Sequence, residues 1–207
     1  MFSRSQLGMS LIELLIGIVI MSILLAIAMP SFTDWMGNVR IRTTAEALQN
    51  GLQVARAEAI RRNTLVRFQL TSTLDNGCTL STSAGNWVVS LDDATSLCAS
   101  NAINEAFAAN DAVNNPSPRL IQKRSAAEGS SGITIAADQS TVTFSGLGRV
   151  TPTPGATGIS INVSNTLGGA TCMASGGTMR CLRVQIAAGG QIRLCDPTRA
   201  STDPEGC

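Results

Sequence analysis

A long uncharged segment near the start of the chain limits what this protein can fold into. Residues 14–29 carry no charge and are almost wholly apolar, and Glu13 is the only charge in the apolar run that begins near Met9. The run is about 20 residues long, which is the length of a helix that crosses a bilayer. A carboxylate is costly in lipid, so Glu13 is expected to have a partner.

The segment differs from an ordinary secretory signal. Such a signal ends in small residues at a cleavage site after the apolar run, whereas this run ends without an A-x-A pattern. A short polar leader that contains Arg4 comes before the run and stops at Gly8. A plain membrane anchor would account for the run, but not for the Gly8–Met9 junction or for Glu13.

The residues from Gly8 to Glu13, GMSLIE, resemble the class III leader of type IV pilins and type II secretion pseudopilins. The resemblance implies that prepilin peptidase cleaves between Gly8 and Met9 and methylates the new N-terminus. Residues 1–8 would then be a leader peptide. Pro30 falls where many pilins carry a helix-bending proline.

Glu13 has a chemical role in this interpretation. After cleavage, the ammonium group at Met9 of a neighbouring subunit can neutralise Glu13 inside a bundle of low dielectric. The pair is satisfied at one axial offset only, so Glu13 would set the registry between subunits. Residues 9–29 would form the transmembrane and filament-core part of a helix.

The sequence becomes amphipathic after Pro30. Glu58 and Arg62 stand four apart in the order that favours an ion pair, and Asn63 is a candidate C-terminal cap. The pattern predicts one long helix whose amphipathic part, residues 30–63, packs on a globular domain. A set of apolar residues spaced by four and three falls on one face of that part: Ile41, Ala45, Leu48, Leu52, Ala55 and Ala59.

The end of the predicted helix restricts the resemblance to one subgroup of these proteins. Residues 55–63, ARAEAIRRN, are similar to the helix end of H-type pseudopilins of type II secretion and of FimT/FimU minor pilins. Residues 142–149, VTFSGLGR, are similar to a strand-and-glycine signature of the same subgroup. Arg61 and Arg62 suit a helix C-terminus, and we favour capping over ligand binding for them.

From residue 64 onward the pattern has period two. Gly189-Gly190 supports a hairpin near the C-terminus, and residues 99–118 read as an irregular insertion. Residues 64–207 are expected to be a β-rich globular domain, which the resemblance places in the periplasm. The fold class is therefore α+β, pilin-like, with a long N-terminal helix packed on a small antiparallel β domain. Strands are predicted at residues 65–70, 87–91, 133–136, 141–144, 159–163, 181–186 and 191–194.

Six cysteines lie in the β-rich part: Cys78, Cys98, Cys172, Cys181, Cys195 and Cys207. They form no C-x-x-C motif, and their spacings do not suit zinc. A domain outside the cytoplasmic membrane, as the resemblance implies, makes disulfides the expected state. Many pairings are open to six cysteines. The expected bonds are Cys78–Cys98, Cys195–Cys207 and, by elimination, Cys172–Cys181, with Cys181–Cys195 as a competing hairpin bond.

The composition excludes the most familiar types of catalytic site. The chain has no His, so it holds neither a Ser-His-Asp nor a Cys-His site, and no imidazole metal ligand. Asp92-Asp93 is an acidic pair, but neighbouring strand residues point to opposite faces, which favours a solvated turn. We expect no cofactor, no metal and no enzymatic activity.

These observations favour a minor pilin or pseudopilin, a structural subunit that helps to initiate or cap a type IV pilus or a type II secretion pseudopilus. Its partners would be other pilins or pseudopilins, prepilin peptidase, the inner-membrane assembly platform and the membrane. The resemblance implies a single-pass inner-membrane protein with a periplasmic C-terminal domain, found later at the tip of the pilus or pseudopilus.

A pilus-associated DNA receptor for natural transformation is the alternative. Some FimT-type minor pilins carry a basic G-R-x-R turn near the C-terminal hairpin, and residues 190–193 read GQIR here, so the first arginine is replaced by glutamine. The chain has 15 Lys+Arg against 14 Asp+Glu, so a local patch is the only basic surface expected to meet phosphates. Its members would be Arg180, Arg183, Arg193 and Arg199.

Overall fold

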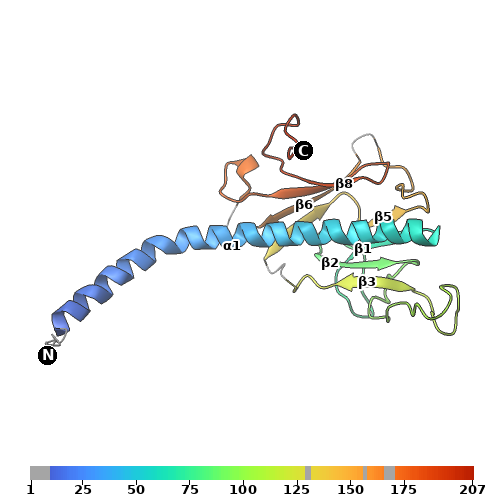
Figure 1. The fold of residues 1–207 in the computed structure, drawn as a ribbon, viewed down its shortest axis with the longest axis horizontal. Helices are drawn as coiled ribbons and strands as arrows, with labels where there is room; N and C mark the ends of the chain where they lie inside the picture. The colour runs from blue at the N-terminus through green and yellow to red at the C-terminus, as the bar shows by residue number, and fades with distance from the viewer. Residues whose placement is uncertain (1–9, 129–131, 156–157, 166–170) are drawn as a thin grey trace, which may run out of the picture. The chain divides into compact units, whose positions relative to one another are not determined.

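The structure is a computed structural model. It describes residues 10–128, 132–155, 158–165 and 171–207, with the side chains of residues 28–31 also outside the description. The chain divides into two units, Met1–Met36 and Gly37–Cys207. The first contains the beginning of helix α1, and the second contains the rest of α1 and the described strands (Figure 1).

Helix α1 runs from Leu11 to Arg62. It ends where Asn63 adopts a left-handed conformation with φ 49°. The backbone N–H groups of Asn63 and Thr64 donate to the carbonyl oxygens of Ile60 and Ala59, both at 3.2 Å. This is the Schellman arrangement, in which a residue with positive φ satisfies the last carbonyls of a helix. The predicted cap at Asn63 is confirmed.

The N-terminal part of α1 bears on the predicted membrane span. Taken alone, no single helical stretch among the described residues is long and apolar enough to cross a membrane. Leu11–Ile27 and Phe32–Arg62, taken together across a bend, have the length and the apolar composition of a membrane-spanning segment. Pro30 lies between these stretches, but its side chain is outside the described residues, so its bending role stays a prediction.

The strands form two antiparallel sheets. The first sheet has the order β3-β2-β1-β5 and the second the order β4-β6-β7-β8. A short 3-10 helix, η2 (Met173–Ser175), precedes the last hairpin. The first sheet contains β1 (Val66–Thr71), β2 (Asn86–Ser90), β3 (Leu120–Arg124) and β5 (Thr141–Phe144). The second contains β4 (Ile133–Ala137), β6 (Ile159–Asn165), β7 (Leu182–Ile186) and β8 (Ile192–Cys195).

Helix α1 and both sheets share one core. The six apolar residues predicted to share a face of the helix, from Ile41 to Ala59, are at most 1% exposed. They belong to one cluster with Phe68 of the first sheet and Val184 of the second. Figure 1 shows these turns of α1 running along both sheets, with β6 and β8 on one side and β1, β2 and β3 on the other. The α+β fold predicted from the sequence is therefore confirmed.

One strand differs from the prediction. The strands expected from the alternating pattern are present, with ends shifted by one or two residues, but β3 (Leu120–Arg124) is an addition. Its sequence, LIQKR, has two apolar residues followed by polar and charged ones, so it lacks a clear alternation. Such a composition suits the edge of a sheet, and β3 is an edge strand.

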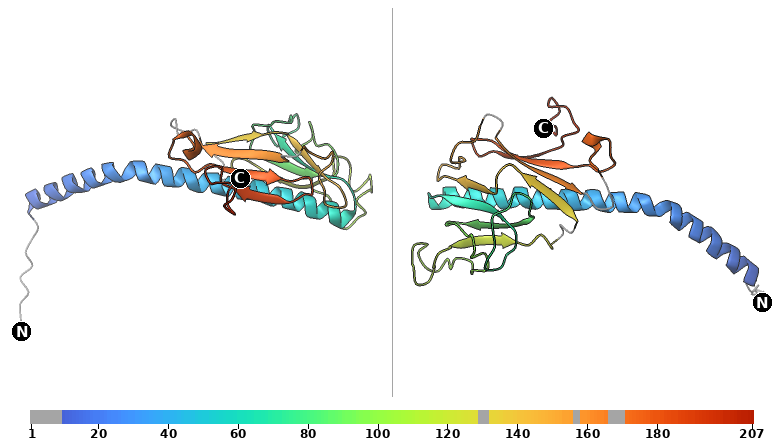
Figure 2. Two further views of the ribbon diagram at one scale, coloured as in Figure 1. Left: turned by 90° about the horizontal axis from the view of Figure 1, so that it is seen from above. Right: turned by 180° about the vertical axis from the view of Figure 1, so that it is seen from behind.

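The three disulfides each close a local loop. They are Cys78–Cys98, Cys172–Cys181 and Cys195–Cys207. These are the pairs named from the sequence, and the competing Cys181–Cys195 bond is absent because both residues have other partners. The last disulfide ties the C-terminal tail to the end of β8. The two views in Figure 2 show the path of this tail, in dark red, up to the C-terminus.

Two tight turns, one from each sheet, contact each other near the end of α1. Gly148 and Gly190 have φ values of 72° and 80°, and a Cβ on Gly190 would lie 1.8 Å from the carbonyl oxygen of Gly148. The same oxygen accepts a hydrogen bond from Nε of Arg56 at 3.1 Å. Glycine is therefore required where the turn after β5 meets the β7–β8 turn. The glycines of the signature at residues 142–149 are restricted by α1 and its cap, because a Cβ on Gly146 would lie 2.5 Å from Oδ1 of Asn63 and a Cβ on Gly148 would lie 2.8 Å from Cδ1 of Ile60.

Candidate functional site

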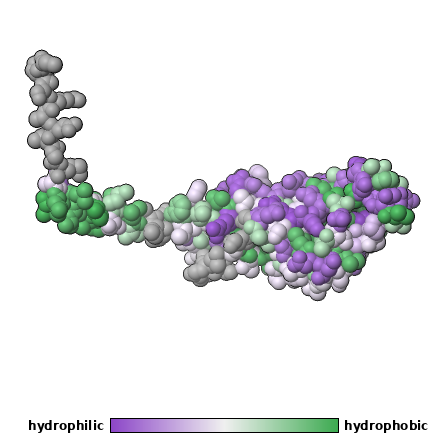
Figure 3. Space-filling model, turned by 90° about the horizontal axis from the view of Figure 1, so that it is seen from below, coloured by the Kyte–Doolittle hydropathy of each residue, from purple (hydrophilic) through white to green (hydrophobic). Residues whose placement is uncertain are grey.

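The N-terminal part of α1 presents a continuous apolar surface. Its described large apolar side chains between Leu11 and Ile27 are 49% to 82% exposed. Figure 3 shows hydrophobic residues along this part of the helix and a mostly hydrophilic surface on the globular part. So much contiguous apolar surface is unfavourable in water and marks a surface that is covered by lipid or by other protein.

Glu13 is held at the first turn of this helix. The backbone N–H of Ser10 donates to a carboxylate oxygen of Glu13 at 3.4 Å, and the backbone N–H of Glu13 donates to Oγ of Ser10 at 3.3 Å. This reciprocal pair is a capping box, which the S-x-x-E spacing of residues 10–13 could have indicated. The carboxylate thus lies at the start of the helix. Gly8 and Met9 are outside the described residues, so cleavage and methylation there stay predictions.

Ion pairs at the other end of α1 hold the insertion of residues 99–118. Glu58 contacts Arg61 at 2.7 Å and Arg62 at 2.8 Å, as expected for the Glu58–Arg62 spacing. Both arginines also contact Glu105 of the insertion. Burial raises the pKa of Glu58, but hydrogen bonds from Arg61 and Arg62 outweigh it, so the pKa lies below its usual value. The basic residues of the helix end thus have a structural role.

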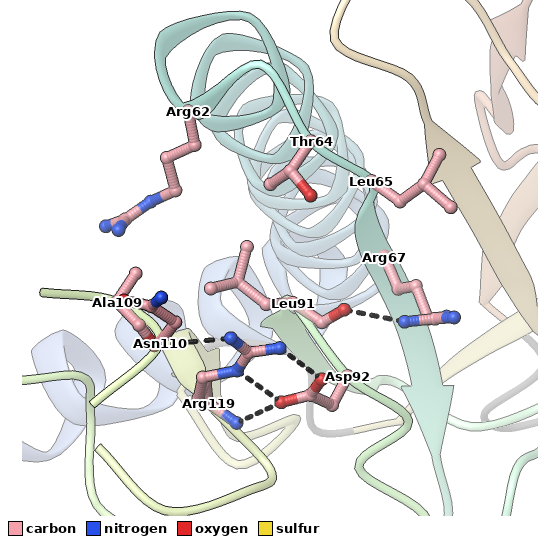
Figure 4. A pocket seen from close by; sticks show the side chains of 9 residues that line it. All are labelled: Arg62, Thr64, Leu65, Arg67, Leu91, Asp92, Ala109, Asn110 and Arg119. Carbon is pink, nitrogen blue, oxygen red and sulfur yellow. Dashed lines mark hydrogen bonds and ion pairs between the residues drawn. The ribbon is translucent and has the colours of Figure 1, made fainter. Parts of the chain in front are cut away.

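A pocket of about 440 Å³ lies beside this helix end (Figure 4). Arg119 donates through Nε and one terminal nitrogen to both carboxylate oxygens of Asp92, at 2.7 and 2.6 Å. Arg67 donates to the carbonyl oxygen of Leu91 at 2.6 Å. The charged groups of the wall are therefore bound to the protein itself. The lining residues are Arg62, Thr64, Leu65, Arg67, Leu91, Asp92, Ala109, Asn110 and Arg119.

The acidic pair Asp92-Asp93 is divided between two structural roles. Asp92 binds Arg119, which holds the pKa of Asp92 at about 2. Asp93 accepts hydrogen bonds from the Thr95 hydroxyl at 2.6 Å and from Gln69 at 2.9 Å. In the part of the chain that the structure describes, no group of three or more His, Cys, Asp or Glu is placed to hold a metal ion.

Two of the four arginines named for a basic patch pair with the C-terminal tail. Nε of Arg180 contacts a carboxylate oxygen of Asp196 at 2.7 Å. Arg199 contacts Asp203 and Glu205, each at 3.0 Å. These acidic residues neutralise Arg180 and Arg199 locally, and the Cys195–Cys207 bond keeps the tail in place.

The other two arginines share one face of the second sheet. Arg183 of β7 lies opposite Cys195 of β8, and Arg193 lies opposite Gln185. Directly paired residues, and residues two apart, point to the same side of a sheet. Arg183 donates to Asn162 at 2.7 Å and Arg193 to Gln185 at 2.9 Å. Neither forms an ion pair within the described ranges, so the patch contains two uncompensated charges.

Comparisons with known proteins point to one family. A family model described as type II transport protein GspH matches residues 44–190. A model of the prokaryotic N-terminal methylation motif matches residues 3–29. The search of curated proteins found no match.

Two crystal structures of the type IV minor pilin FimU from Pseudomonas aeruginosa (strain PAO1) are similar to this chain. The first is 15% identical, covers 81% of this chain and 94% of FimU, and has a TM-score of 0.46. The second is 16% identical, covers 80% of this chain and 98% of FimU, and has a TM-score of 0.45.

Proposed function

Because the chain belongs to the type II transport protein GspH family, we propose that it is a minor pilin or pseudopilin that helps to initiate or cap a type IV pilus or a type II secretion pseudopilus. It is a pilin-like structural subunit with an N-terminal methylation motif. The observation that carries the proposal is the exposed apolar surface of Leu11–Ile27, with Glu13 as its single charge.

The proposal assigns a role to each part of the chain. Residues 1–8 are a leader that prepilin peptidase removes. Residues 9–29 anchor the subunit in the inner membrane and later enter the filament core. Residues 30–63 are the amphipathic part of the helix that supports the globular domain. Residues 64–207 form that domain, which faces the periplasm and stands at the pilus or pseudopilus tip.

Glu13 gives the assembly step its specificity. An isolated carboxylate in hydrocarbon costs several kcal/mol, and a neighbouring ammonium group removes much of that cost. The capping box holds the carboxylate of Glu13 at the backbone N–H of Ser10, the residue that would follow Met9 in the mature chain. A subunit whose Glu13 meets the amine of Met9 from another pilin or pseudopilin is therefore stabilised at one axial offset. The assembly platform in the inner membrane would deliver subunits to this position.

Leader cleavage is tested by the substitution Gly8→Ala in the full chain. We expect the unprocessed form to accumulate in the membrane fraction, because the peptidase no longer finds its glycine. Mass spectrometry of the unsubstituted protein should find an N-methylated Met9. Normal processing of the Gly8→Ala protein would contradict the assigned cleavage site.

Assembly is tested separately by Glu13→Ala. We expect a processed, membrane-bound protein that is absent from sheared filaments, because the registry contact is lost while the anchor remains. Glu46→Ala is the matched control, since Glu46 lies on the same helix and pairs with exposed Arg42. Piliation and secretion that are both unchanged in a strain lacking the whole protein would overturn the proposed function.

The DNA-receptor alternative gains no support from the β7–β8 face. Two of its four arginines, Arg180 and Arg199, are paired with carboxylates of the tail. Phosphate binding would have to displace these contacts or rely on Arg183 and Arg193 alone. We therefore keep the assembly role as the single proposal.

A further inference from the structure

An exposed aromatic pair follows the apolar segment of α1. Phe32 and Trp35 are each 59% exposed, and their ring centroids are 5.8 Å apart with an interplanar angle of 37°. Residues three apart on a helix lie on the same face. Two large aromatic side chains are thus presented together on the first unit of the molecule. Met36, 37% exposed, follows one residue later.

The position of the pair along the helix matches the thickness of a bilayer. From Leu11 to Phe32 a helix rises about 32 Å at 1.5 Å per residue, and the hydrocarbon core of a membrane is about 30 Å thick. The charged residues that follow Glu13 along the chain begin beside this pair, with Asp34 first and Arg40 next. The pair therefore lies where an apolar stretch of bilayer length changes to a polar sequence.

The chemistry of the pair fits the boundary between lipid headgroups and acyl chains. An indole ring has an apolar body and one N–H donor, so it is most stable where one side is apolar and the other is wet. Trp and Tyr are enriched at this depth in membrane proteins and help to fix the tilt and depth of a helix. Contacts between helices in a membrane instead favour small residues, and Phe32 and Trp35 are bulky.

We propose that Phe32 and Trp35 bind the phospholipid interface at the C-terminal end of the membrane span and fix its depth before assembly. The proposal rests on the membrane-anchored stage of the proposed function. The lipid surface is the assigned partner because the pair lies on the same helix as the exposed apolar surface of Leu11–Ile27 and is itself exposed. With this anchor, Glu13 is held at the opposite end of the span, so the depth of the aromatic pair also sets the depth of the registry residue.

Trp fluorescence of the full chain in phosphatidylcholine vesicles tests this proposal. The chain has two Trp, and Trp87 is 3% exposed in the core, out of reach of lipid. The signal of Trp35 is the difference between the unsubstituted protein and Trp35→Phe, a variant that keeps an aromatic ring. We expect a blue-shifted Trp35 emission that is quenched more strongly by bromines high on the acyl chain than by bromines near its end.

The depth readout also detects the anchoring role. Phe32→Ala should shift the preferred quenching depth of Trp35, because half of the anchor is removed, whereas Val39→Ala, beyond the pair, should leave it unchanged. Vesicle flotation runs in parallel with every sample.

Each outcome decides the proposal. Flotation with the vesicles together with strongest quenching by shallow bromines supports it. Flotation with strongest quenching by deep bromines, or without any quenching, overturns the interfacial anchor and leaves the proposed function standing. Trp35 that is shielded from lipid but cross-links to a second copy assigns the pair to a contact between subunits and also overturns it. Protein that does not float contradicts both the anchor and the membrane stage of the proposed function.

Discussion

Single ion pairs hold the loops of the globular domain in place. The bidentate contact between Arg119 and Asp92 fixes the end of β2 against the residue that precedes β3. The side chains are 28% and 23% exposed, so solvent screens the pair only partly. Such a pair is worth more than an exposed surface salt bridge, which typically contributes below about 1 kcal/mol.

Acid should remove the contribution of this pair in a defined pH range. The pKa of Asp92 is about 2 in the folded chain against an ordinary value of 3.8, because Arg119 hydrogen-bonds to its charged form. A lowered pKa stabilises the fold by about 2 kcal/mol at pH values above 3.8, and this contribution disappears as the pH falls towards 2. Asp92→Asn should therefore lower the free energy of unfolding at pH 6 and make no difference near pH 2.

Urea unfolding at a series of pH values measures this difference. Asp75→Asn, at an exposed position, is the control and should change stability little at any pH. If Asp92→Asn and the unsubstituted protein lose stability in parallel between pH 4 and pH 2, Asp92 is not the source of the acid sensitivity.

The only lysine of the chain has a comparable structural role. Nζ of Lys123 donates to the carbonyl oxygens of Cys98, Ala99 and Ser100 at 3.3, 3.2 and 3.3 Å. The ammonium group thereby binds three successive carbonyl oxygens of one loop. The composition did not predict this contact, because the contact depends on β3 lying beside that loop.

Among the elements, the turns carry the strictest sequence requirements. The β7–β8 turn and the turn after β5 come so close that a Cβ at Gly190 would overlap the carbonyl oxygen of Gly148. Gly189, one residue earlier, has no other atom within 4 Å of its ideal Cβ position. Two adjacent glycines therefore differ in what they tolerate.

Gly190→Ala should destabilise the globular domain by about 1–3 kcal/mol, because the positive φ and the overlap both oppose a Cβ. Gly189→Ala should change the free energy of unfolding by less than about 0.5 kcal/mol, as is usual at open surface positions. Thermal unfolding of the two variants provides the comparison. Equal melting temperatures for both would show that the turns can separate without cost.

Elements were predictable where one periodicity dominated. The apolar face from Ile41 to Ala59 and the hairpin at Gly189-Gly190 follow from spacing and turn chemistry alone. Strand β3 (Leu120–Arg124) was missed because an edge strand needs little apolar alternation. The division into two sheets was not predictable either, because antiparallel strands of similar pattern can pair in several orders. Packing on the helix and the geometry of the turns determine which order forms.

At the scale of the molecule, the buried core formed by the described residues lies in the second unit. Its described members begin at Ile41, and the first unit contributes none. The matches to known families show the same division: the N-terminal methylation motif matches residues 3–29, and the GspH family model matches residues 44–190. Candidate residues at Gly8, Met9 and Glu13 could be named because they resemble the class III leader motif. The ion pairs of Arg180 and Arg199 with the tail could not, because they depend on the folded path of the tail.

A fragment from Val39 to Cys207 should therefore fold without the apolar segment. We expect a soluble monomer with one cooperative thermal transition, because the fragment retains the three disulfides and the core residues that the structure describes. Calorimetry and near-UV circular dichroism measure this. A broad transition, or loss of the near-UV signal, would mean that residues before Val39 stabilise the domain.

The disulfides also determine how the chain responds to force. Their sequence separations are 20, 9 and 12 residues, and none joins one sheet to the other. If tension along a filament opened the domain, the two sheets could separate while each closed loop stayed short. At about 3.4 Å per residue, and after the Cα–Cα spans of 6.1, 5.4 and 5.2 Å across the cystines are subtracted, the oxidised chain would reach a contour length roughly 120 Å shorter than the reduced chain. The cystines thus limit extension rather than resist opening.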